Sequence, residues 1–152
     1  MLDYADLARA GILICTGATM QVGPAIFESI QNDYSGFIDF ICKLAVSKKS
    51  DPEIVRLFRE NFLCLNAEAA FCDFQACNHF DVSQRLSSIA VPVLVVTAED
   101  DKLTPAQNGA ALERGIKNAT RAHIIDAGHT VAMEKPDEVN EIILEFLDQT
   151  GL

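Results

Sequence analysis

The 152-residue sequence has few basic residues, no long apolar run and no paired cysteine motif. Its 12 Lys and Arg stand against 22 Asp and Glu, which gives a formal net charge of −10 at pH 7. Nucleic acids and anionic membranes are bound through clustered Lys and Arg side chains. The charge therefore argues against both classes of partner.

Features of a secretion signal or a membrane span are also missing. Residues 1–6 contain two Asp and no basic residue, whereas a secretory signal starts with basic residues followed by an apolar run of about 7–15 residues. The best apolar run, Gly11–Cys15, is far shorter than the roughly 20 residues that span a membrane. We expect a soluble, cytoplasmic protein with one ordinary domain.

The cysteines form no recognisable framework. Their number is odd and no pair has C-x-x-C spacing: Cys15, Cys42, Cys64, Cys72 and Cys77. Most lie in apolar stretches, where a thiol behaves as a small buried hydrophobic group. We therefore expect reduced structural thiols and no disulfide framework. No His lies at ligand spacing from a Cys pair, so we expect no metal.

Three short apolar runs predict strands that are buried on both faces: Gly11–Thr16, Val91–Thr97 and Ala122–Asp126. Helical patterns follow the second and third runs. The first opens at Pro105, with Thr104 before it as the helix cap, and the second opens at Pro136. The alternation of strands and helices predicts an α/β fold with parallel strands.

A long stretch without strands, from about Gly23 to Phe80, separates the first run from the second. Pro24 opens a helix whose apolar side extends to Ile41, and Pro52 opens a second helix through about Leu65. Asn66 can cap a third helix through about Cys77. We therefore predict a helical block that is inserted between two strands.

Acidic and histidine side chains follow the second and third predicted strands. Asp100 and Asp101 lie in the loop after Val91–Thr97, and His129 follows Gly128 after the third strand. Taken singly, each residue is best interpreted as an ordinary turn or loop residue. Because parallel strands end at the same edge of a sheet, however, the two loops should lie side by side. A carboxylate would then orient the imidazole of His129, as the acid of a catalytic triad does.

The other two histidines lack such a context. His123 lies within the third predicted strand, where we expect it to be packed. His79 lies in the helical block, where it is either structural or lines a pocket.

The stretch from Phe80 to Leu147 resembles the carboxyl-terminal part of the α/β-hydrolase family. The family pattern is a strand, G-x-x-D-x-x-x-P, a helix, a strand, then G-H and E-x-P. It matches the segments Ala98–Pro105, Gly128–His129 and Glu134–Pro136, with Ala98 where the family usually has Gly. The resemblance implies that Asp101, four residues before Pro105, is the triad acid and that His129 is the triad base.

The remaining residues resemble neighbouring parts of the same fold. Residues 1–19 resemble the strand that follows the nucleophile-bearing turn, residues 20–80 a helical cap, and residues 81–152 the carboxyl-terminal core with its Asp and His loops. The family's Ser nucleophile lies on a G-x-S-x-G turn. The sequence contains no such turn, and the half of the fold with the oxyanion-hole loop is missing. The resemblance implies no cofactor and no metal.

The resemblance implies that the full-length parent enzyme hydrolyses a small, fairly apolar ester or related carbonyl compound, because the helical cap supplies apolar residues. These are Phe27, Phe37, Phe40, Phe58 and Phe62. Cleavage of C–C or carbon–halogen bonds by related members stays open. We expect the isolated chain to be inactive, because the nucleophile and the oxyanion hole are missing. The alternatives are a non-catalytic fragment, a subunit that needs an N-terminal partner chain, and a binding module.

The first predicted strand, Gly11–Thr16, would lack its outer neighbour. A free strand edge and exposed apolar surface both favour association. We therefore expect a homodimer joined through this edge, or else residues 1–10 folded over it.

Overall fold

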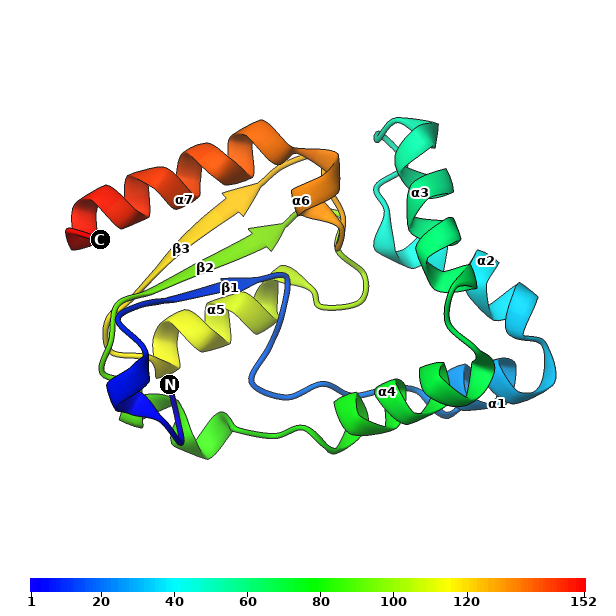
Figure 1. Ribbon diagram of the computed structural model, residues 1–152, viewed down its shortest axis with the longest axis horizontal. Coiled ribbons are helices and arrows are strands. Elements are labelled where there is room, and N and C mark those ends of the chain that lie inside the picture. Colours follow the sequence, from blue (N-terminus) through cyan, green and yellow to red (C-terminus); the bar gives the residue numbers. More distant parts are fainter.

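Three strands form one parallel sheet in the computed structural model, which describes residues 1–152 (Figure 1). The strands are β1 (Gly11–Ile14), β2 (Val93–Ala98) and β3 (Ala119–Ile124), and their order in the sheet is β1-β2-β3. Gly11 lies opposite Val93, which in turn lies opposite Ala119. The predicted α/β class with parallel strands is confirmed.

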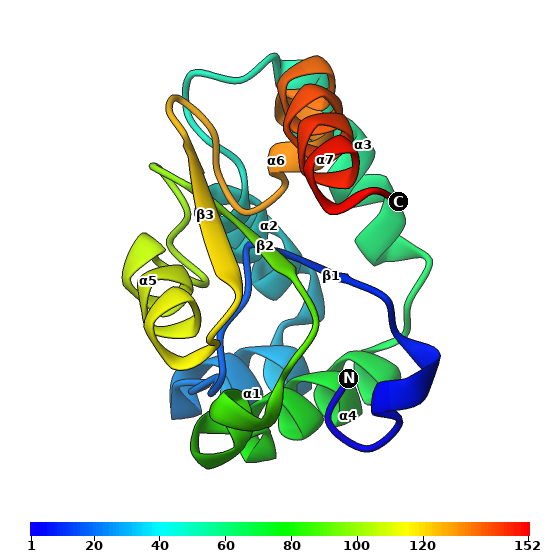
Figure 2. The same ribbon diagram turned by 90° about the vertical axis from the view of Figure 1, so that its left-hand side faces the viewer.

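The central strand β2 is buried along its whole length, because helices cover both faces of the sheet (Figure 2). On one face, Leu94 and Val96 pack in a cluster with Val139 and Phe146 of α7 (Pro136–Thr150). On the other face, side chains of β2 pack against α5 (Ala106–Gly115) and the short helix η2 (Ser83–Ser88). Burial of each such aliphatic side chain stabilises the folded state by about 1.5–3 kcal/mol. The apolar residues that predict β2 from the sequence therefore also stabilise the sheet.

The two outer strands differ from their predicted ranges. β3 runs from Ala119 to Ile124 rather than over residues 122–126. It pairs on one side only, so exposed polar residues such as Thr120 and Arg121 belong to it. β1 ends at Ile14, because Cys15 adopts a left-handed φ of 45° that breaks the extended conformation.

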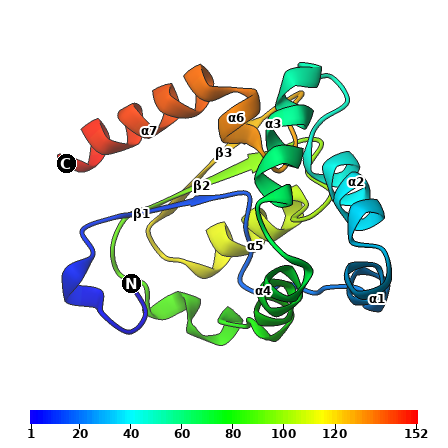
Figure 3. The same ribbon diagram turned by 45° about the vertical axis from the view of Figure 1, so that its right-hand side comes forward.

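The helical block, residues 24–79, lies beyond the carboxyl ends of the strands (Figures 1 and 3). The predicted helix from Pro24 to Ile41 is wrong as one element, since Asp33 ends one helix and caps the next by accepting the N–H of Gly36. Pro52 and Asn66 open the other helices as predicted. The block consists of α1 (Pro24–Asn32), α2 (Tyr34–Ala45), α3 (Pro52–Leu63) and α4 (Ala67–His79).

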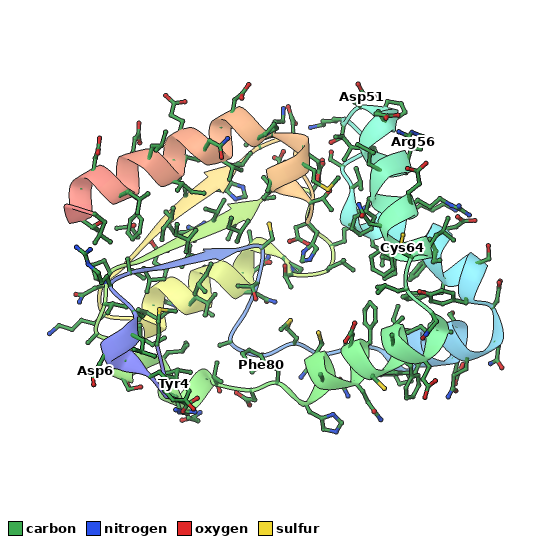
Figure 4. The ribbon with its side chains drawn as sticks, viewed as in Figure 1. Tyr4, Asp6, Asp51, Arg56, Cys64 and Phe80 are labelled. Atoms are coloured by element: carbon green, nitrogen blue, oxygen red, sulfur yellow. The ribbon has the colours of Figure 1, made fainter.

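The helical block has a core of its own. Ile30, Phe37, Ile38 and Ile41 are almost completely buried, and Ala70 of α4 joins them. Two linkers connect the block to the sheet, and a single antiparallel bridge between Thr19 and Asp81 holds the linkers together. Phe80, labelled in Figure 4, lies on the returning linker.

The cysteines are all free, and they are less uniformly buried than expected. Cys15 and Cys42 are buried, but Cys64 and Cys72 are exposed. Cys64 lies just after the end of α3 at the surface of the block (Figure 4). No helix in the structure combines the length and the apolar character needed to cross a membrane.

The helical block packs tightly against the core at Gly128. A Cβ atom at this position would lie 2.4 Å from the carbonyl oxygen of Ala45 and 2.8 Å from the nitrogen of Ser47. Both are backbone atoms, so no side-chain rotation could relieve the clash. The chain after α2 therefore lies directly on the loop that carries His129.

We predict that Gly128→Ala lowers the free energy of unfolding by about 1–3 kcal/mol, the usual cost of overpacking. Gly23→Ala is the matched control, because nothing lies within 4 Å of a Cβ at that position. Equilibrium denaturation of both variants measures the difference. Equal effects of the two substitutions would contradict the close contact.

Candidate active site

The loop after β2 is built around the side chain of Asp101, which is fully buried. One carboxylate oxygen, Oδ1, accepts the N–H groups of Leu103 at 2.9 Å and Thr104 at 2.8 Å. The other, Oδ2, accepts the hydroxyl of Thr104 at 2.8 Å. The turn that the carboxylate stabilises leads into α5, so Asp101 has the turn-forming role expected of an Asp at such a position.

The same carboxylate also holds His129. The Nδ1 atom of His129 lies 3.0 Å from Oδ2 of Asp101, so the two loops meet as their strand-end positions predicted. Asp100 has a different partner, since its Oδ2 accepts the hydroxyl of Ser47 at 2.5 Å. His129 retains 31% side-chain exposure. A buried acid therefore holds an imidazole that remains accessible.

Electrostatics keep the Asp101 carboxyl ionised. Burial alone would raise its pKa, but the hydrogen bonds from His129 and Thr104 outweigh burial and hold the pKa below its usual value. An ionised carboxylate accepts the Nδ1–H of a neutral imidazole, which leaves Nε2 of His129 free to accept a proton. Such an arrangement is the one that general-base chemistry at a histidine requires.

Thr104 is a part of the site that the sequence analysis interpreted only as a helix cap. The helix α5 begins at Ala106 with Pro105 in the cap position, and the Thr104 hydroxyl is instead bound to Asp101. The Thr104 Oγ1 atom also lies 3.2 Å from Nδ1 of His129. Its position between the acid and Pro105 was the only sequence signal available.

A cavity of about 620 Å³ lies between the helical block and the loops that follow the sheet. His129, Thr104 and Asn108 line it from the core side. The side chains that line it from the helical block are mainly apolar: Ile26, Ile41, Leu44, Phe58, Phe62 and Phe74. His129 therefore faces a largely apolar cavity.

Only two of the five phenylalanines that the sequence analysis offered as cap residues line this cavity. They are Phe58 and Phe62. Phe37 is buried inside the helical block, Phe27 packs against Phe71, and Phe40 is 47% exposed. Helical spacing shows that a residue lies on an apolar face, but it does not show which neighbour that face contacts.

No nucleophile faces His129 within the chain. No serine lines the cavity, and although Cys77 of α4 does, no hydroxyl or thiol is hydrogen-bonded to Nε2 of His129. Cys15 lies at the end of β1, close to the dyad, but burial and the nearby Asp101 carboxylate raise the pKa of its thiol to about 12. A thiol with such a pKa stays protonated near neutral pH, and only the thiolate is a strong nucleophile.

The other histidines lie outside the site. His79 is exposed at the end of α4 and contacts the carbonyl oxygen of Gln75. The expectation that His123 is packed is wrong, because β3 is an edge strand and the side chain is exposed beside Thr97. No group of three or more metal-ligating side chains is arranged to hold a metal ion.

Comparison with known proteins agrees with this geometry. A family model described as the alpha/beta hydrolase fold matches residues 25–136. A solved thermophilic esterase is 30% identical, with a TM-score of 0.90, over 99% of this chain and 60% of its own. The enol-lactonase from Burkholderia xenovorans LB400 has the same fold, with 19% identity and a TM-score of 0.89 over 97% of this chain and 59% of its own.

A curated relative matches a shorter stretch. The bifunctional epoxide hydrolase 2 of Mus musculus is 42% identical over 59 residues, which is 39% of this chain and 11% of the mouse protein. The chain thus spans about three fifths of the solved relatives and a smaller part of this curated one. The family model covers well over half of the chain, and the chain belongs to the α/β-hydrolase fold family.

Proposed function

We propose that this chain supplies the acid and the base of a hydrolytic triad, Asp101 and His129, for an ester or related carbonyl substrate. The observation that carries the proposal is the 3.0 Å contact between the buried Asp101 carboxylate and His129, whose side chain lines the apolar cavity. The nucleophile would come from a segment outside the 152 residues.

In the proposed reaction, a serine hydroxyl attacks the substrate carbonyl carbon while Nε2 of His129 takes its proton. The ionised Asp101 stabilises the imidazolium that results. The tetrahedral intermediate collapses, and His129 returns the proton to the departing alcohol. Water then repeats the sequence on the acyl-enzyme, which releases the acid and restores the serine.

The cavity supports a small, fairly apolar substrate, with the helical block acting as a cap over it. Its lining from the block is mainly aliphatic and aromatic, and its volume suits a small molecule. Ester hydrolysis is preferred because the thermophilic esterase matches almost the whole chain at 30% identity. Epoxide, C–C and carbon–halogen substrates are the alternatives that substrate profiling would separate.

Ligand binding without catalysis is the second candidate function. It is favoured by the cavity, which this chain forms by itself. Saturable binding of a small apolar ester in isothermal titration, with no turnover even beside a nucleophile-bearing segment, would support it over hydrolysis.

We further propose that β1 pairs with another chain, either a second copy or an N-terminal partner. The N–H groups of Gly11 and Cys15 donate toward β2, to Pro92 and Val96. Because alternate residues of a strand donate to opposite sides, the N–H groups of Ile12 and Ile14 point to the free edge. Such an edge is a template for strand pairing.

The first prediction from this proposal concerns activity. The purified chain should not hydrolyse activated esters faster than a surface histidine does, and a fluorophosphonate probe should label none of its serines. If a G-x-S-x-G segment is encoded directly upstream, co-expression with it should produce esterase activity that His129→Ala abolishes. Stoichiometric labelling of a serine in the chain alone would disprove the proposed division of the triad.

The second prediction concerns the pH dependence of stability. The folded pKa of Asp101 is lowered, so its stabilising effect is present above the unfolded pKa, about 3.9, and is lost as pH falls through the folded pKa. At neutral pH, Asp101→Asn should lower the free energy of unfolding by about 1–3 kcal/mol. The difference between wild type and variant should shrink below about pH 4.

Asp6→Asn is the control for this measurement, because Asp6 is exposed and lies far from the site (Figure 4). Chemical denaturation over a pH series gives both curves. A difference between wild type and Asp101→Asn that persists unchanged at low pH would show that the carboxylate charge is not what stabilises the turn.

The third prediction concerns the free edge of β1. Light scattering coupled to size exclusion at micromolar concentration should detect a homodimer of the isolated chain. Hydrogen exchange should then be slow at the amides of Ile12 and Ile14. A monomer in which both amides exchange freely would refute pairing between copies. A monomer in which they are protected would favour residues 1–10 folded over the edge.

A further inference from the structure

The carboxylate of Glu134, at the end of the short helix α6 (Val131–Glu134), accepts hydrogen bonds from four residues. Two of the donors flank His129, and two belong to the helical block between α2 and α3. A carboxylate has about four acceptor positions, so this one is fully used. The sequence motif E-x-P includes Glu134, but nothing in the proposed reaction uses it.

On the core side, Glu134 holds the residues before and after His129. The N–H of Gly128 lies 3.0 Å from both carboxylate oxygens. The hydroxyl of Thr130 lies 2.8 Å from Oε1. These bonds fix the two neighbours of His129, whose ring contacts Asp101.

On the other side, Glu134 holds the segment that connects α2 and α3. The N–H of Ser47 lies 3.0 Å from Oε2, and the hydroxyl of Ser50 donates to the same oxygen. Ser47 is buried, and its own hydroxyl donates to Asp100 in the loop that carries the acid. The carbonyl oxygen of Ala45, the last residue of α2, also accepts the N–H of Thr130 at 3.3 Å.

We propose that Glu134 is a positioning residue that couples the position of the helical block on the core to the orientation of His129. The Glu134 carboxylate binds both groups of donors. If residues 47–50 move away, the carboxylate loses two of its hydrogen bonds and no longer holds the His129 loop as firmly. The block would then influence the dyad through this contact as well as by covering the cavity. An effect of this coupling on catalysis rests on the proposed function. The coupling itself is a structural property, the orientation of the His129 ring.

Nitrogen NMR of the His129 ring tests the proposal without any activity measurement. At a pH where the ring is neutral, the wild-type chain should show a single tautomer with the proton on Nδ1. In Glu134→Ala, the two ring nitrogen signals should move toward each other as the tautomers mix. Glu134→Gln should restore part of the wild-type pattern, because one amide oxygen can still accept from Gly128 and Ser47. Glu141→Ala, at an exposed position of α7, should leave the ring signals unchanged.

A second variant tests the coupling from the helical block. Ser50→Ala removes one donor to Glu134 but leaves the core untouched, and it should shift the His129 signals in the same direction by a smaller amount. Ser35→Ala, at an exposed position of α2, is its control. If Glu134→Ala does not fold, the His129 ring signals of Ser50→Ala, compared with those of Ser35→Ala, test the proposal instead.

The outcomes separate this proposal from the proposed function. A folded Glu134→Ala chain with wild-type His129 signals, or a Ser50→Ala chain with none of the expected shift, would overturn the coupling. A wild-type His129 that carries its proton on Nε2 would instead contradict the Asp101–His129 dyad, whatever the Glu134 variants do.

Discussion

Burial of the ionised Asp101 carboxylate is the constraint on which the site depends. A charge removed from water is stable only where hydrogen-bond donors replace the water. The donors here are the backbone of Leu103 and Thr104, the Thr104 hydroxyl and the ring of His129. The tight turn before α5 and the position of the His129 loop therefore both follow from the need to supply donors to this carboxylate. The residue that shapes the turn also contacts the ring of His129.

The sheet brings the two halves of the dyad together and continues into their loops. Beyond the ends of β2 and β3, the N–H of Glu99 donates to Ile124 at 2.9 Å and that of Asp100 to Ala127 at 2.8 Å. Hydrogen bonds between these loops thus extend the strand pairing up to the residues next to Asp101 and Gly128. A dyad mounted on such an extension is held more precisely than one on free loops.

Sequence order was sufficient to place an acidic loop beside His129, because each follows an apolar strand and parallel strands end at one edge. The choice of Asp101 over Asp100 came from the resemblance to the family pattern, in which the acid lies four residues before Pro105. The same local patterns located β2 and the helices that start at Pro24, Pro52 and Pro136. They failed where the deciding interaction lies elsewhere. Pairing with β2 makes β3 begin at Ala119 and end at Ile124, and Asp33 breaks a helix that apolar spacing alone would continue. The contact between Ser47 and Glu134 joins residues 87 positions apart, so no local pattern could reveal it.

The aromatic rings of the helical block belong both to its core and to the cavity, and this double role limits how the cavity can change. Phe62 and Phe74 line the cavity, yet their rings lie 6.3 and 5.4 Å from that of the buried Phe37. A smaller side chain at either position enlarges the cavity at the expense of the block's core. The ring of Phe58 lies 5.1 Å from that of Phe62, at a tilt of 54°, and has no ring contact with Phe37. The cavity can therefore be reshaped at Phe58 with less loss of stability than at Phe62 or Phe74.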